Sequence, residues 1–136
     1  MAKFELVKLE RELPPNPEVA FFKLSIDGKC PFDAFSAKMQ SSGNQKQALD
    51  KMHTIIVHLS NGTRVPTQQF QELKHRDRHD PWPDYEIRAK QLRVYLFEDI
   101  EKGKIIVLGE VKTEKTQGKT IQEMRAIKRA YFESKT

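Results

Sequence analysis

Residues 85–97 read YEIRAKQLRVYLF, and their alternation determines which kind of sheet the chain builds. If Lys90 and Gln91 form a two-residue turn, Arg88 faces Arg93 across an antiparallel hairpin. One face of this hairpin is then apolar and the other is polar, because side chains alternate along a strand. The apolar face carries Tyr85, Ile87, Ala89, Leu92, Val94 and Leu96, and the polar face carries Glu86, Arg88, Arg93 and Tyr95.

The pairing of Arg88 with Arg93 needs an explanation, because like charges directly opposite each other destabilise a strand pair unless an anion lies near them. An anionic substrate on the polar face is one explanation. The other is that Glu86 and neighbouring acids neutralise both arginines, as on many exposed sheet faces. The pattern alone leaves both interpretations open.

Further strands are predicted on both sides of the hairpin. After a turn at residues 99–103, KIIVLGEV (104–111) is apolar on both faces, which is typical of a central strand. VAFFKLSI (19–26) predicts another strand, and residues 2–12 suggest an edge strand. Residues 66–84 are the least regular segment, with a possible helical turn around Phe70 and Leu73.

Three helices complete the pattern. A short one follows Pro31, a longer one with an apolar stripe spans 44–59, and the last begins at Thr120, which has capping-box spacing to Glu123. We therefore predict a single α+β domain over residues 1–136, an antiparallel sheet with two N-terminal helices and a C-terminal helix. Residues 1–18 are an extra N-terminal segment.

The composition limits the possible partners and location. The 136 residues carry a formal charge of +5, and residues 111–136 hold seven basic and three acidic side chains, so we expect a polyanion site toward that end. No apolar run approaches the ~20 residues of a membrane span, and the N-terminus does not resemble a signal peptide, so a cytoplasmic protein with no membrane partner is expected. The single cysteine, Cys30, excludes a disulfide within the chain and a cysteine-based zinc site.

Two basic clusters are candidate phosphate contacts. Lys74, His75, Arg76 and Arg78 come just before the hairpin, and Lys112, Lys115 and Lys119 lie between the last strand and the last helix. Solvated loops explain both clusters nearly as well.

Other kinds of chemistry find little support in the sequence. His75 and His79 are four residues apart, but Pro81 and Pro83 disfavour a helix through them and no third ligand is evident. We therefore expect no metal and no other cofactor. There is no glycine-rich phosphate loop, nucleophile elbow or catalytic carboxylate pair.

A series of segments resembles one family. FFKLSIDGKCPFDAFSAKM, the striped helix, FQELKH, YEIRAKQLRVYLF, KIIVLGEVKTEKTQ and IQEMRAIKRAYFES together resemble the RelE-like toxins, especially the HigB-like branch, from about Val19 to Ser134. The resemblance implies the RelE microdomain fold. It also implies the toxin of a type II toxin–antitoxin system, an mRNA interferase that cuts message in the ribosomal A site and is held inactive by a cognate antitoxin.

The resemblance also implies roles for individual residues. Arg88, Arg93 and Lys74 correspond to the family's catalytic side chains. From the basic clusters and the polar face of the hairpin, we expect the flanking RNA contacts to come from Arg76, Tyr95, Lys112, Lys115 and Lys119. The chain differs from the family at Leu108–Val111, where the family's Leu-His-Gly-Phe becomes Leu-Gly-Glu-Val, at Glu114, and at Thr120. A non-catalytic RNA- or protein-binding module on the same scaffold is therefore the alternative.

Overall fold

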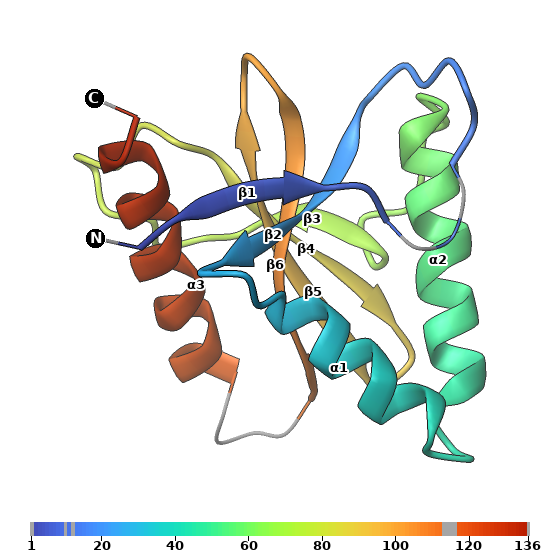
Figure 1. The fold of residues 1–136 in the computed structure, drawn as a ribbon. Coiled ribbons are helices and arrows are strands. Elements are labelled where there is room, and N and C mark those ends of the chain that lie inside the picture. The colour runs from blue at the N-terminus through green and yellow to red at the C-terminus, as the bar shows by residue number, and fades with distance from the viewer. Residues whose placement is uncertain (1, 10, 12, 113–116, 136) are drawn as a thin grey trace.

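The computed structural model describes residues 2–9, 11, 13–112 and 117–135. They form a six-stranded sheet with the strand order β1-β2-β6-β5-β4-β3 and helices on both faces (Figure 1). Among these residues, no helix combines the length and the apolar character needed to cross a bilayer. The elements are β1 Phe4–Val7, β2 Phe21–Ile26, α1 Pro31–Gln40, α2 Lys46–Ser60, β3 Phe70–Glu72, β4 Asp84–Ala89, β5 Leu92–Asp99, β6 Gly103–Val111 and α3 Gln117–Glu133.

The predicted hairpin is confirmed in its register. β4 and β5 pair so that Ala89 lies opposite Leu92 and Arg88 lies opposite Arg93. Lys90 has a φ of 53°, a left-handed conformation that a two-residue hairpin turn requires. The predicted edge strand is also confirmed, because β1 pairs only with β2 among the described strands.

Two predictions about the sheet are wrong. Four of the five described strand pairs are antiparallel, but β2 and β6 run parallel, so the sheet is mixed. A long excursion through α1, α2 and three strands separates β2 from β6, and no local pattern reveals which way two such distant strands will pair. The expected helical turn around Phe70 is instead strand β3, whose Phe70 ring stacks on Tyr85 with 5.1 Å between ring centroids.

Each face of the sheet has its own core (Figure 1). On one face, α1 packs against β2 and β6 while α2 packs against β4. On the other face, which we call the α3 face, α3 crosses β5 and β6. The first core includes Phe35, Met52, Ile87, Leu92 and Val94, and the second includes Leu24, Tyr95, Phe97, Ile105 and Met124.

Gly109 allows α1 to approach β6 closely. A Cβ atom at this position would lie 2.5 Å from Cδ2 and Cε2 of the Phe35 ring. Real carbon contacts do not reach that distance, and Phe35 is itself buried on α1. The glycine is therefore required by packing.

We predict that Gly109→Ala lowers the free energy of unfolding by about 1–3 kcal/mol, the usual range for overpacking a core. Gly118→Ala is the matched control, since its Cβ would meet nothing within 4 Å and alanine favours a helix. Urea denaturation of both variants measures the difference. Equal stability of the two variants would contradict the close approach of Phe35.

A buried group of charges fixes α3 to the sheet. Lys128 on α3 and Asp84 on β4 are both fully buried, and Lys128 Nζ lies 2.8 Å from Asp84 Oδ2 and 2.7 Å from Asp80 Oδ2. The same ammonium donates to the carbonyl of Trp82, and Arg125 donates two hydrogen bonds to Asp84. Burial alone would raise the pKa of Asp84, but hydrogen bonds from Arg125 and Lys128 outweigh it and lower that pKa.

We predict that Lys128→Met lowers the free energy of unfolding by about 3 kcal/mol, because buried Asp84 keeps only Arg125 as a cation and Asp80 loses its contact with the ammonium. Lys119→Met is the control, since it removes an exposed lysine from the same helix and should change stability by less than about 0.5 kcal/mol. Urea midpoints compare the two. A Lys128 variant as stable as the Lys119 variant would show that the ion group does not hold α3.

Candidate functional site

Three charged residues lie side by side across the central strands. The register places Arg88 of β4 opposite Arg93 of β5, and Arg93 opposite Glu110 of β6. Arg93 alternates with Leu92 and Val94, which belong to the first core, so this charged row (Arg88, Arg93 and Glu110) lies on the α3 face. The predicted polar face of the hairpin is therefore real, and an acid from β6 extends it.

Arg88 is held by an acid of its own strand. Its guanidinium hydrogen-bonds to Oε1 of Glu86, a residue only 1% exposed, and Gln71 of β3 donates to the same oxygen. The Arg88 side chain remains 35% exposed. Glu86 thus provides part of the neutralisation that the sequence left as an alternative.

Arg93 is much less accessible. The residue is 6% exposed, and its Nη1 donates to the carbonyls of Lys90 and Leu92 at 2.8 and 2.9 Å. Its Nε is buried and has no hydrogen-bond partner in the described part of the chain. Burial, and next the charge of Arg88, lowers the pKa of Arg93, although a guanidinium stays protonated in proteins. One donor of this cation is thus unsatisfied among the described residues, although it has no access to solvent in this conformation.

Glu110 has an equally unusual environment. Both of its carboxylate oxygens are buried without a hydrogen-bond partner among residues 2–9, 11, 13–112 and 117–135. It lies opposite Arg93 in the sheet, yet the two side chains form no ion pair within 4.0 Å. The nearby negative charge reduces the attraction of the charged row for an anion.

The hairpin end of the sheet gathers one further predicted residue. The backbone N–H of Lys112 donates to the carbonyl of Gln91 at 2.7 Å, so exposed Lys112 lies beside the turn that joins β4 and β5. Lys119 is exposed in the first turn of α3. The prediction for Lys115 falls outside the described residues.

Lys74 and Arg76 lie elsewhere. The Lys74 carbonyl accepts a hydrogen bond from Arg125. Arg76 binds the Glu72 carboxylate and donates to the Asp80 carbonyl. Leu73 pairs with Asp84 at the start of β4, four residues or ~13 Å along the strand from Arg88. The structure does not bring Lys74 together with the two arginines.

Tyr95 differs from the prediction in its exposure. The side chain points to the α3 face as expected, but it is completely buried in the second core. No ring face is open for a base to stack on in this conformation. Tyr95 therefore packs in the core beneath the charged row and does not contribute to its surface.

Sequence reasoning missed how the C-terminal cations are used. Arg125 and Lys128 bind Asp84. Lys135 Nζ lies 2.6 Å from Asp99 Oδ2, and the Asp99 carboxylate also accepts hydrogen bonds from the Tyr131 hydroxyl and the backbone N–H of Glu101. These acids are in sequence segments far from α3, so the local excess of basic residues did not reveal them. Three cations of the basic C-terminal region are thus paired with acids, whereas Lys112, Lys119 and Arg129 are exposed.

The two histidines of the preceding loop do not form a metal centre. In the described part of the chain, no three His, Cys, Asp or Glu side chains are grouped so that they could hold a metal ion. His79 accepts a hydrogen bond from Arg78, and His75 has a φ of 61° in a loop without helical structure.

Comparison with protein-family models, with curated proteins and with solved structures finds no match for this chain. The function must therefore be inferred from the site itself. At the hairpin end, Arg88 is the partly exposed cation of the charged row, Arg93 Nε is buried without a partner among the described residues, and exposed Lys112 lies beside the same turn.

Proposed function

We propose that the chain is the toxin of a type II toxin–antitoxin pair, an mRNA endoribonuclease that acts on message in the ribosomal A site. Leaving out the edge strands β1 and β3, the element order is strand, two helices, three strands and a helix, which is compatible with a RelE-like arrangement. A cognate antitoxin in the same cytoplasm is part of the proposal. Its function would be to cover the cations at the hairpin end.

One observation carries the proposal. The hairpin places Arg88 and Arg93 opposite each other on the α3 face, and the buried Nε of Arg93 lacks a partner among the described residues. A protein tolerates facing cations and an unsatisfied buried donor when a ligand completes them. A phosphate oxygen has the charge and the acceptor geometry to do so.

The chemistry of RNA cleavage suits such a pair. Attack of a ribose 2′-hydroxyl on the adjacent phosphate needs a base for the hydroxyl proton, cations for the phosphorane charge and an acid for the leaving oxygen. In this proposal Arg88 and Arg93 stabilise the phosphorane. Lys112, which lies at the same end of the sheet, replaces Lys74 as the lysine for proton transfer.

A second function is favoured by a specific observation. Glu86 and Glu110 carry two negative charges that balance the two arginines, and Arg93 is only 6% exposed. These features suit a module that binds RNA or a protein without cleaving it. In the nuclease the arginine variants lose message cleavage, whereas in the binding module there is no cleavage to lose and they lose binding alone.

We predict that Arg93→Ala reduces message cleavage on programmed ribosomes by about one to three orders of magnitude, as expected when one charge-stabilising donor is removed. Arg88→Ala and Lys112→Ala should also reduce cleavage. Lys74→Ala and Arg64→Ala are matched controls from outside the hairpin end, and both should cleave at the wild-type rate. Thermal midpoints are measured for every variant.

Stability is separated from catalysis by Tyr131→Phe. This variant loses the hydrogen bond from Tyr131 to Asp99, far from the hairpin end, and should be destabilised by about 1 kcal/mol while it cleaves normally. If wild-type protein leaves message intact on ribosomes, the binding module replaces the nuclease. If Arg93→Ala and Tyr131→Phe lose activity in parallel with their stability, Arg93 has only a structural role.

We predict that Glu110→Gln strengthens binding of a short RNA oligonucleotide severalfold at low salt, because it removes a negative charge beside Arg93 while keeping the shape of the side chain. The gain should shrink at higher ionic strength. Glu101→Gln, an exposed acid in the β5–β6 turn, is the control. Fluorescence anisotropy measures both, and an unchanged affinity for Glu110→Gln would place RNA away from the charged row.

A further inference from the structure

A second site lies on the opposite face of the sheet, under α1 and α2. A cavity of about 150 Å³ lies between the two helices and β2, and it is open on one side. Its apolar wall is formed by Phe32 of α1 and by Leu49, Met52 and Ile56 of α2. A cavity of this volume accommodates a group of benzene size when its walls are apolar.

The polar end of the cavity contains a buried lysine. Lys23 follows Phe21 by two residues in β2, so both side chains point toward α1 and α2. The Lys23 side chain is 5% exposed, and Nζ lies 2.6 Å from Asp33 Oδ1 in the first turn of α1. An ammonium has three donors, and only one is used by the described residues.

Asp33 is the complementary half of this polar end. Its side chain is 42% exposed, so the carboxylate stands at the rim where the cavity meets solvent. Its Oδ2 makes no hydrogen bond with the described residues, nor does the hydroxyl of Ser36 one turn further along α1. The rim thus offers two spare lysine donors and a spare carboxylate oxygen next to each other.

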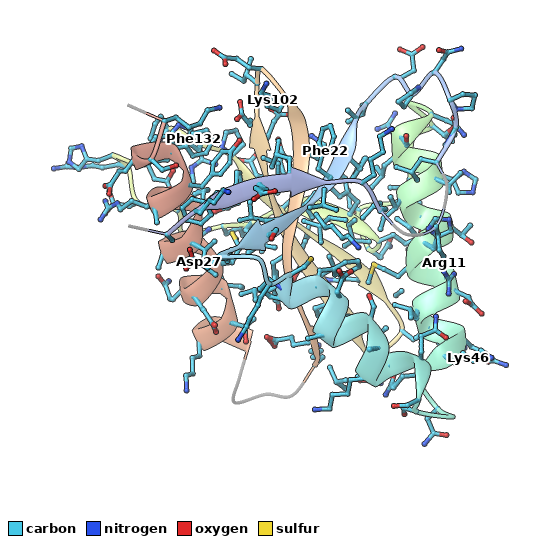
Figure 2. All side chains as sticks on the ribbon, in the orientation of Figure 1. Arg11, Phe22, Asp27, Lys46, Lys102 and Phe132 are labelled. Carbon is cyan, nitrogen blue, oxygen red and sulfur yellow. The ribbon has the colours of Figure 1, made fainter. Side chains whose placement is uncertain are left out.

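The remaining polar groups do not add net charge. Arg11 projects beside α2 and binds Asp50 at 2.7 Å (Figure 2). Burial, and next the charge of Arg11, lowers the pKa of His53, which disfavours the charged form of this imidazole. The site is therefore balanced: one cation and one anion side by side, above an apolar cavity.

We propose that this cavity binds a free hydrophobic amino acid of about the size of leucine. The carboxylate of such a zwitterion would accept hydrogen bonds from Lys23, and its ammonium would donate to Asp33 Oδ2. The branched side chain would enter the cavity against Leu49, Met52 and Ile56. A zwitterion matches the balanced rim better than a simple acid or amine, because either of those would bring an uncompensated charge.

This proposal does not rest on the proposed nuclease function, because the cavity and the charged row lie on opposite faces of the sheet. NMR of ¹³C-labelled methionine methyl groups detects binding in the cavity directly. Met52 lines the cavity and is buried, whereas Met124 is buried in the second core and serves as an internal reference. We expect L-leucine to shift the Met52 signal saturably, with a Kd of about 10 mM or tighter, and to leave Met124 unchanged.

Analogues and variants test the chemistry of recognition. 4-Methylpentanoate lacks the ammonium and 3-methylbutylamine lacks the carboxylate, and each should bind about tenfold more weakly. Lys23→Gln removes the charge but keeps a donor, and it should weaken leucine binding about tenfold. Lys38→Gln, on the exposed side of α1, should leave leucine binding unchanged. Ser36→Leu fills the cavity, leaves the Lys23–Asp33 pair in place and should abolish the shift.

Three results would overturn the proposal. The first is a Met52 signal that stays unchanged up to the solubility limit of leucine. The second is an analogue that binds as tightly as leucine, which would show that the rim does not recognise both charges of a zwitterion. The third is a leucine-induced shift that persists in Ser36→Leu, which would place the ligand elsewhere even if Lys23→Gln fails to fold.

Discussion

The contact between Lys128 and Asp84 determines the architecture of the α3 face. Both residues are fully buried, and together with Arg125 and Asp80 they join α3, the start of β4 and the loop before it. Such a group stabilises only when every charge has partners, because desolvation of each ion costs several kcal/mol. Lys128 has two carboxylates and a carbonyl, and Asp84 has two cations, so that condition is met.

This ion group also explains where a functional surface can lie. Residues 111–136 carry seven of the chain's 24 basic side chains, but three of these, Arg125, Lys128 and Lys135, are paired with acids. The hairpin end has Arg88, which is paired with Glu86 but about a third exposed, together with buried Arg93 and exposed Lys112. The net charge of the chain therefore says less about anion binding than the few cations whose donors are not already used.

The sequence predicted the hairpin, its register and the presence of all three helices, because those depend on local alternation and on the 3.6-residue period. The last helix begins at Gln117, three residues before the predicted start at Thr120. The parallel pairing of β2 with β6 and the strand at Phe70 were missed, because both depend on partners distant in sequence. Lys128 could have been recognised. It continues the stripe of Ile121 and Met124 toward Tyr131 at helical spacing, so a lysine on that stripe needed a buried acid.

Glu110 is the residue on which the two proposed functions most clearly divide. A guanidinium that stabilises a transition state is most effective when it is held rigidly and shielded from water, and Arg93 meets both conditions through its burial and its bonds to two carbonyls. Glu110 lies next to it without a hydrogen bond, and its charge opposes an incoming phosphate. Both of its oxygens are buried, so Glu110 acts on a ligand only through its charge and not by direct contact. That charge weakens a phosphate site, whereas it favours a partner that brings a basic group to the hairpin end.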